Sequence, residues 1–417
     1  MSKQTYPNFR ILNYNKINKK WKITTICEVI IIKMIYLDNA ATSFPKAIDT
    51  MRIQEIIDRT PGSINRRGYS SDYNLSSILD ESRRKIKTFI GSGFEDKLIF
   101  TFNATHAINM ALRGILNKND HVLTTRYEHS AISRTLYSLT HERNISYSLL
   151  NVNTNTSEEE FEELLLNLLS PNSKMIVMTY GSNVTGDIIY KSKFGEIAHK
   201  YGLIVFVDAS QAVGNIEINV KRENIDIMAF SGHKSLMGLT GTGFLYFRNN
   251  MNLPLIFTGG TGIKSEDDFI IPTEELDYEV GTMNIPGILS INQSIHFLEQ
   301  NFKEVITKKS MLTKEIIKRL KAIDGIHIYG NFEAENHLPI ISFNAKNLHP
   351  VNEVAIILEN VYNIVTRAGI HCAPWTHKML GTFPQGTVRI SPGYFNEMED
   401  IYTLEKALKE ISLIKQI

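Results

Sequence analysis

Short apolar runs that alternate with amphipathic segments are the feature that most restricts the fold of this chain. Each run is rich in β-branched or aromatic residues and ends in polar residues, and the runs occupy residues 97–101, 121–125, 174–179, 203–207 and 226–230. Runs that are apolar on both faces and separated by helical segments are typical of parallel strands covered by helices on both sides. Residues 243–247 follow a tight glycine turn, so we expect that strand to run antiparallel to its predecessor. The pattern predicts an α/β protein with a mainly parallel sheet.

The pattern changes near Ile288. From there, long amphipathic helical stretches at 290–300 and 303–322 alternate with short strand-like runs. We therefore expect a large α/β domain over residues 34–289 and a smaller α+β domain over residues 290–417. A basic extension of unknown role precedes them at residues 1–33.

Charge and cysteine content exclude several classes of protein. The 45 Lys and Arg residues nearly balance the 44 Asp and Glu residues, which argues against a protein that coats nucleic acid or anionic lipid. Two cysteines, Cys27 and Cys372, cannot form a disulfide framework or a four-cysteine metal site. We expect a cytoplasmic enzyme without a metal, a membrane span or a nucleic-acid partner.

The first 34 residues differ from the rest in charge. They carry seven basic residues and one acidic residue, Glu28. Their longest apolar run, 29–32, is shorter than the roughly 7–15 apolar residues of a secretory signal. We interpret this segment as an extension, and a native start at Met34 is the alternative.

Polar side chains with catalytic potential follow five of the predicted strands. Carboxyl ends of parallel strands meet at one edge of a sheet, where ligands bind, so we expect these side chains to share one site. They are Thr105, His106, His129, Asn183, Asp208, Gln211, Ser231, His233 and Lys234.

This set of residue types matches the needs of pyridoxal 5′-phosphate. A lysine such as Lys234 can form a Schiff base when its pKa is lowered, and a shielded aspartate such as Asp208 can keep a ring nitrogen protonated. An imidazole such as that of His129 can stack on a flat ring, and a donor-rich helix start can bind phosphate.

Motifs for other ligands are incomplete. The glycine-rich segment 259–265 lacks the glycine that precedes the lysine of a phosphate loop, and 241–243 lacks the third glycine of a dinucleotide site. His371, Cys372 and His377 have no second cluster that would complete a zinc site.

Several segments resemble the class V aminotransferase family, and most closely its cysteine desulfurase and selenocysteine lyase members. They are 37–42, the segment around His129, 182–186, 208–211, 231–234 and 367–374. The resemblance extends over residues 34–417. It implies the type I fold of pyridoxal phosphate enzymes, with a seven-stranded sheet, and a homodimer.

The resemblance also implies a role for each matching residue. Lys234 would hold the cofactor, Asp208 would pair with its ring nitrogen, and His129 would stack on the ring. The 3-hydroxyl would contact Asn183 and Gln211. The phosphate would contact Thr105, His106, Ser231, His233 and the partner subunit's copy of Thr282. The substrate would contact Arg389 through its α-carboxylate and Asn39 and Ala40 near its amine.

Cys372 separates desulfurases from other members of the family. A thiolate can attack the sulfur of L-cysteine and leave alanine and an enzyme persulfide. The short loop 372–381 resembles the branch that passes sulfur to a separate acceptor protein. Alternatives are an aminotransferase, a carbon–sulfur or carbon–selenium lyase acting on another amino acid, and a binding protein that lacks turnover. Ala104, His106 and Trp375 depart from the family pattern, and so does 61–69.

Overall fold

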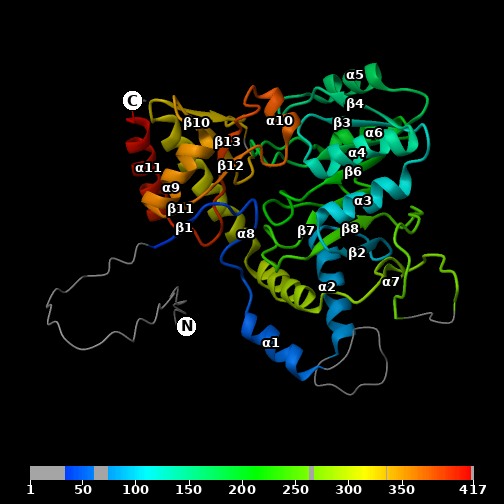
Figure 1. The fold of residues 1–417 in the computed structure, drawn as a ribbon. Coiled ribbons are helices and arrows are strands. Elements are labelled where there is room, and N and C mark those ends of the chain that lie inside the picture. The colour runs from blue at the N-terminus through cyan, green and yellow to red at the C-terminus, as the bar shows by residue number, and fades with distance from the viewer. Residues whose placement is uncertain (1–32, 61–73, 263–266, 335, 415–417) are drawn as a thin grey trace. The chain divides into compact units, whose positions relative to one another are not determined.

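A seven-stranded sheet lies at the centre of the larger part of the molecule (Figure 1). Its strand order is β2-β8-β7-β6-β5-β3-β4, and only β8 runs opposite to the other strands. The strands are β2 (Lys97–Thr101), β3 (His121–Thr125), β4 (Ser146–Leu150), β5 (Ser173–Thr179), β6 (Ile204–Asp208), β7 (Ile227–Ser231) and β8 (Gly243–Phe247). This topology confirms the predicted mainly parallel sheet and the antiparallel strand at 243–247.

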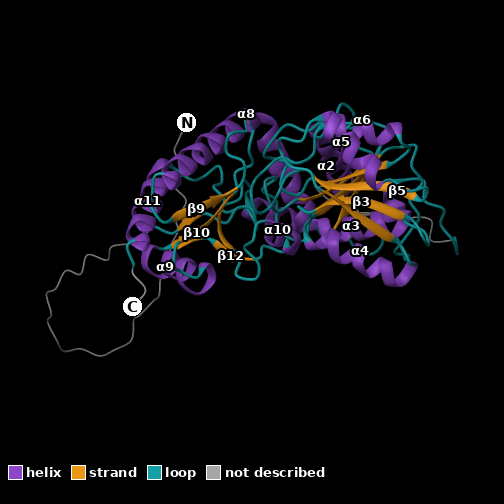
Figure 2. Cartoon of the chain, turned by 90° about the horizontal axis from the view of Figure 1, so that it is seen from above, coloured by secondary structure: helices purple, strands orange, loops and turns teal. Residues whose placement is uncertain are grey.

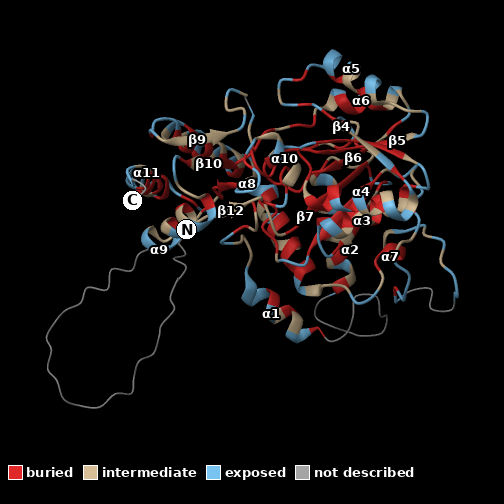
Figure 3. Cartoon of the chain, turned by 45° about the horizontal axis from the view of Figure 1, so that its top comes forward, coloured by how far each residue is buried: buried red, intermediate tan, exposed pale blue. Residues whose placement is uncertain are grey.

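Alternating side chains of the strands point into two apolar layers, one on each face of the sheet. Helices α3 (Ala104–Ile115) and α4 (Ser130–Arg143) cover one face, where Val122, Val177 and Ala229 are buried. The other face is covered by α2 (Leu75–Phe89), α5 (Glu158–Leu168), α6 (Ser192–Lys200) and the first part of α8 (Ile285–Lys321). Figure 3 shows the buried strands between helices whose outer surfaces are exposed.

A second sheet has four antiparallel strands in the order β12-β13-β10-β9. They are β9 (Ile326–Tyr329), β10 (Ile341–Ala345), β12 (Arg367–Gly369) and β13 (Thr387–Ile390). The second half of α8 packs with this sheet and with α9 (Ala355–Tyr362) and α11 (Met398–Ser412) around a separate apolar cluster. Figure 2 shows α8 curving past the smaller sheet.

The prediction of two separate helices in this region is wrong. Residues 290–300 and 303–322 were expected to form two helices, but the structure has one helix from Ile285 to Lys321. Phe302 packs edge-on against Phe89 of α2, with ring centroids 4.9 Å apart, and Asn301 Nδ2 donates to the carbonyl of Phe297. Packing of Phe302 against α2 therefore buries part of α8 at the point where two helices were expected to separate.

The segment after Met34 joins the smaller sheet region. Strand β1 (Ile35–Tyr36) pairs in parallel with β11 (Ile364–Val365), and Asp38 bridges to Ser391. This pairing brings residues near 40 against the C-terminal part of the chain. The domain boundary near residue 289 stays a prediction.

The computed structural model describes residues 33–60, 74–262, 267–334 and 336–414. The basic extension up to residue 32, with Cys27, and the segment 61–69 lie outside these residues. The remaining described helices are α1 (Thr50–Arg59), α7 (Glu275–Tyr278), α10 (Pro374–Met379) and the π-helical turn η1 (Pro350–Val354). Of the helices within the described ranges, none combines the length and apolar character that crossing a membrane requires.

Candidate active site

A cavity of about 200 Å³ opens at the carboxyl ends of the central parallel strands. Most of the predicted site residues line it. They are Ala40, Thr105, His129, Asn183, Asp208, Gln211, Ser231, His233, Lys234 and Arg389. Strands β6 and β7 each end one residue later than expected, so Asp208 and Ser231 are the last residues of their strands. The strand backbone therefore fixes both side chains directly.

Lys234 follows β7 by three residues and shares the cavity with Asp208. Burial lowers the pKa of Lys234 to about 8, while the negative charge of Asp208 acts in the opposite direction. Asp208 Oδ1 accepts hydrogen bonds from the backbone N–H of Ser210 at 2.9 Å and from the Ser210 hydroxyl. Ser210, which the sequence did not single out, thus orients the carboxylate.

His129 caps the N-terminus of α4 and faces the cavity. Its Nδ1 accepts a hydrogen bond from the backbone N–H of Ala131 at 3.0 Å, which assigns the ring proton to Nε2. Burial, together with the nearby charge of Lys234, lowers the pKa of His129 to about 4. The imidazole is therefore neutral at neutral pH and suited to stacking on a flat aromatic ring.

The N-terminus of α3 forms a group of donors at one end of the cavity. Asn103 caps the helix through a 2.9 Å hydrogen bond from the backbone N–H of His106, and Asn103, Ala104 and Thr105 line the cavity. First-turn amides of a helix have no acceptor within the helix and bind anions well. Gly243 permits this arrangement, because a Cβ there would lie 2.4 Å from the backbone of Asn103.

His233 adds to the same group of donors. It lines the cavity, and its buried Nδ1 finds no hydrogen-bond partner in the described structure. An unpartnered buried ring nitrogen is costly unless a ligand contacts it.

Three predicted residues lie apart from the cavity. The ring of His106 packs between Phe102 and Phe257, with centroid distances of 5.2 and 5.0 Å. Asn39 lines a neighbouring pocket and donates to the carbonyl of Ser391. Thr282 is exposed. The roles that the resemblance implies for these residues stay predictions.

Two arginines lie side by side in the wall of the cavity. Arg389 on β13 and Arg367 on β12 are direct register partners in the antiparallel pair, and both line the cavity. Arg389 is 1% exposed, donates from Nη2 to Asp38 Oδ1 at 2.9 Å and donates from Nη1 to the carbonyl of Asn183 at 3.0 Å. Its buried Nε has no acceptor within the described residues. Arg389 can therefore still donate to a carboxylate in the cavity.

Cys372 lies at the rim of this cavity and is exposed. The Sγ atom is 3.7 Å from Nη2 of Arg367, so one guanidinium contacts both the cavity and the thiol. Sequence reasoning missed this role of Arg367. The only sequence signal is its position five residues before Cys372, within the segment that resembles the family.

Backbone hydrogen bonds hold the Cys372 loop in an unusual conformation. His371 and Cys372 have φ angles of 51° and 57°, in the left-handed region that non-glycine residues rarely adopt. Asn183 Nδ2 donates to the carbonyl of His371 at 2.7 Å. The backbone N–H and the hydroxyl of Ser130 donate to the carbonyl of Cys372 at 2.7 and 2.8 Å.

The family resemblance implies that Cys372 is the nucleophile in sulfur release from a cofactor-bound substrate. Under that expectation, removing the Ser130 hydroxyl should loosen Cys372 without disturbing the cavity. For Ser130→Ala we expect the turnover number for sulfur release to fall by about tenfold, because a near-attack geometry depends on small displacements. The absorbance of the bound cofactor should stay unchanged. Ser133→Ala, on the same helix, is the control and should behave as the wild type. Unchanged turnover in Ser130→Ala would show that the backbone N–H alone anchors the loop.

Comparison with known proteins identifies the class of protein that this fold and site define. The pattern of the class-V aminotransferase family matches residues 35–404, so the chain belongs to this family.

Particular relatives can be named. A probable cysteine desulfurase of Methanothermobacter thermautotrophicus is 32% identical over 91% of this chain and 94% of its own length. Among solved structures, the apo cysteine desulfurase of Thermococcus onnurineus has 29% identity and a TM-score of 0.82, covering 91% of this chain and 94% of that chain. The Escherichia coli cysteine desulfurase CsdA has the same fold, with 23% identity, a TM-score of 0.78, and coverage of 90% and 94%.

Members of this family depend on pyridoxal 5′-phosphate, and the cavity has the chemistry to hold it. A lysine with a lowered pKa and a buried carboxylate share the cavity with a neutral imidazole. The start of α3 and the unpartnered Nδ1 of His233 supply donors for a phosphate dianion. The residues present therefore fit this cofactor.

Proposed function

We propose that this protein is a pyridoxal phosphate-dependent cysteine desulfurase that converts L-cysteine to L-alanine and forms a persulfide on Cys372. The observation that carries the proposal is the placement of Cys372. Its exposed thiol is contacted by Arg367, and Arg367 lines the cavity that contains Lys234 and Asp208. A plain aminotransferase has no use for a thiol on a loop whose backbone carbonyls accept three hydrogen bonds, one at His371 and two at Cys372. The names of the relatives and of the solved structure at 29% identity support the same activity.

Individual residues would hold the cofactor as follows. Lys234 would bind its aldehyde carbon, Asp208 its ring nitrogen, and His129 the face of its ring. Asn183 and Gln211 are expected near the 3-hydroxyl. The phosphate would lie at the start of α3 with Thr105, Ser231 and His233. When bound, pyridoxal phosphate supplies an electron sink for negative charge that develops on the substrate.

Arg389 and Lys234 prepare the substrate. The α-carboxylate of L-cysteine pairs with Arg389, whose position is fixed by Asp38 and the carbonyl of Asn183. Once the amino group of L-cysteine has taken the place of Lys234 on the cofactor, the freed Lys234 Nζ takes the α-proton as general base, which its lowered pKa permits near neutral pH.

Cys372 then takes the sulfur. Its Sγ, as thiolate, attacks the substrate sulfur, a sulfur–sulfur bond forms and the carbon–sulfur bond breaks. The bonding electron pair remains with the substrate carbon, which gains a proton. The balanced change is L-cysteine plus the Cys372 thiol giving L-alanine plus the Cys372 persulfide. Arg367, 3.7 Å from Sγ, orients the sulfur during this step.

The activity itself is tested with purified protein loaded with pyridoxal phosphate. With L-cysteine and a thiol reductant, alanine and sulfide should appear in equal amounts. Assays with selenocysteine, and with alanine plus 2-oxo acids, distinguish the lyase and aminotransferase alternatives. Amino transfer without sulfide release would reject the desulfurase proposal. A colourless protein that binds no cofactor would reject the desulfurase, lyase and aminotransferase activities alike.

Cofactor capture should depend on pH through Lys234. Only the neutral amine attacks the aldehyde, and burial lowers the pKa of Lys234 to about 8. Below this pH the lysine is mostly protonated, so the capture rate of the apoprotein should rise with pH and level off above about 8. Stopped-flow absorbance measures this rate. A midpoint near the ordinary lysine value of 10.5 would contradict the predicted environment of Lys234.

Three further properties stay predictions. The homodimer would bring the exposed Thr282 to the partner subunit's phosphate site. A separate acceptor protein would receive sulfur from Cys372, and the enzyme would act in the cytoplasm.

A further inference from the structure

Lys309 on α8 is a buried cation outside the proposed mechanism. It is 5% exposed, and no carboxylate among the described residues forms an ion pair with it. Its Nζ donates instead to two neutral acceptors, Asn215 Oδ1 at 2.6 Å and the carbonyl of Gly214 at 3.1 Å. Burial lowers the pKa of Lys309 to about 7, as expected for an ammonium group without a counter-ion. Such a group is costly to keep in a fold.

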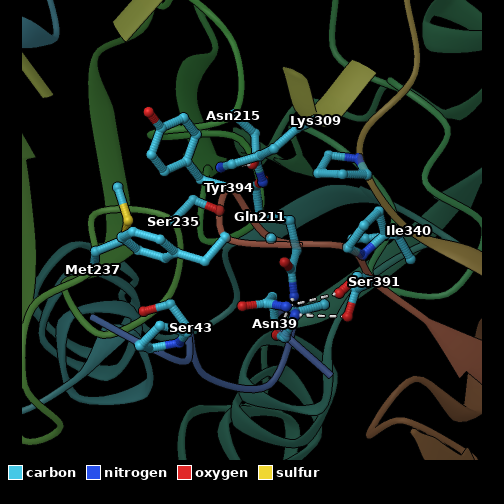
Figure 4. Close-up of a pocket in the computed structure, with 16 residues that line it drawn as sticks. Asn39, Ser43, Gln211, Asn215, Ser235, Met237, Lys309, Ile340, Ser391 and Tyr394 are labelled. Atoms are coloured by element: carbon cyan, nitrogen blue, oxygen red, sulfur yellow. Dashed lines mark hydrogen bonds between the residues drawn. The ribbon is translucent and has the colours of Figure 1, made fainter. Parts of the chain in front are cut away.

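Hydrogen bonds connect Lys309 to the wall of the active-site cavity. Asn215 Nδ2 donates to the backbone carbonyl of Gln211 at 2.7 Å, and Gln211 Nε2 donates to the carbonyl of Ala40 at 3.0 Å. Gln211 and Ala40 line the active-site cavity on one side. On the other side they line a small neighbouring pocket of about 20 Å³, which Lys309 also lines (Figure 4). In Figure 4, Lys309 and Asn215 lie together at one end of this pocket, and Gln211 extends from them toward Asn39.

These contacts cross between distant segments of the chain. The turn that contains Gln211 follows β6, whereas Lys309 belongs to the long helix that also packs against the smaller sheet. The long side chain of Lys309 carries its donor at the tip and spans from α8 to Asn215. A hydrogen bond from the amine of a buried lysine is stronger in a low-dielectric site than the same bond in water.

We propose that Lys309 is a positioning residue that acts through Asn215 to fix Gln211 against the cofactor. Lys309 holds the amide of Asn215, and the amide holds the backbone of Gln211. The side chain of Gln211 then keeps its place between Ala40 and the cavity. The proposal rests on the proposed function, because the contact of Gln211 with the cofactor is part of it.

The first test compares cofactor affinity in two variants of adjacent lysines. In Lys309→Met, which is similar in length and lacks the donor, the dissociation constant for pyridoxal phosphate should rise by about tenfold, in line with a buried Asn215 oxygen that loses its donor. Lys308→Met is the matched control. Lys308 sits next to Lys309 on the same helix but pairs with Glu397 at the surface, so its loss should leave the affinity unchanged.

The melting temperature of the apoprotein separates positioning from a purely structural role. Removing an amine that is costly to bury offsets the loss of its hydrogen bonds to Asn215 and Gly214, so Lys309→Met should melt close to the wild type. A lower melting temperature with unchanged cofactor affinity would overturn the proposal.

Variants of Asn215 test the proposal independently of whether Lys309→Met folds normally. Asn215→Asp keeps an acceptor for Lys309 but removes the amide donor to Gln211, so it should weaken cofactor binding to a similar extent. In the Asn215→Ala/Lys309→Met double variant the loss should equal that of Asn215→Ala alone, because both substitutions act on one connected set of bonds. Independent, multiplying losses would overturn the proposal. If the wild type releases sulfide and these variants bind cofactor normally, only this inference fails; if the wild type binds no cofactor, the proposed function fails too.

Discussion

Cys372→Ser is expected to abolish sulfide release from L-cysteine while the protein keeps its cofactor absorbance. The hydroxyl of serine is a far weaker nucleophile toward sulfur than a thiolate, so we expect a loss of at least about 10³-fold. The cofactor should stay bound, because Cys372 lies at the rim and does not line the cavity that holds Lys234 and Asp208.

The chain offers a matched control for this substitution. Its only other cysteine is Cys27, in the segment that has no counterpart in the family resemblance. Cys27→Ser should release sulfide at the wild-type rate. Sulfide release that persists in Cys372→Ser and is lost in Cys27→Ser would remove Cys372 from the mechanism.

Arg389→Lys is expected to raise the KM for L-cysteine by at least about 30-fold. Lysine keeps the positive charge but cannot offer a planar fork that contacts Asp38, the Asn183 carbonyl and a substrate carboxylate together. Losing part of a buried, hydrogen-bonded charge pair costs about 2–5 kcal/mol, which corresponds to this size of effect. Steady-state kinetics over a wide range of cysteine concentrations measures the change.

Arg248 provides the control for that experiment. It also pairs with an aspartate, Asp226, at 3.1 Å, but it immediately follows β8 and does not line the cavity. Arg248→Lys should leave KM within about twofold of the wild-type value. A normal KM in Arg389→Lys would mean that another group, with Arg367 the nearest candidate, binds the carboxylate.

The strands of the central sheet could be predicted because their burial leaves a clear mark on the sequence. Strands such as β5 and β7 are apolar on both faces, and the tight glycine turn before β8 predicted that β8 runs antiparallel to its predecessor. The edge strand β4 was missed because its Ser-Tyr-Ser start is only partly buried and lacks the apolar signal. The continuity of α8 was missed because packing of Phe302 on Phe89, a contact between distant segments, decides it.

The site residues also fall into those that the sequence could predict and those that it could not. Side chains that directly follow strands, such as Asp208 and Lys234, could be grouped from topology alone, since parallel strands end at one edge. Arg367 and Asp38 could not, because their positions depend on pairings between distant segments. Arg367 reaches Arg389 through the register of β12 with β13, and Asp38 reaches it because the chain after β1 bridges to Ser391. Such non-local pairings carry no periodic signal along the chain.

The most direct test of the central claim is the mass of the peptide that contains Cys372. The protein loaded with pyridoxal phosphate is mixed with L-cysteine without a reductant, alkylated and digested. We expect this peptide to gain the mass of one sulfur atom in an amount equal to the first equivalent of alanine, while the Cys27 peptide keeps its mass. Alanine formed with no added sulfur on Cys372 would contradict the account.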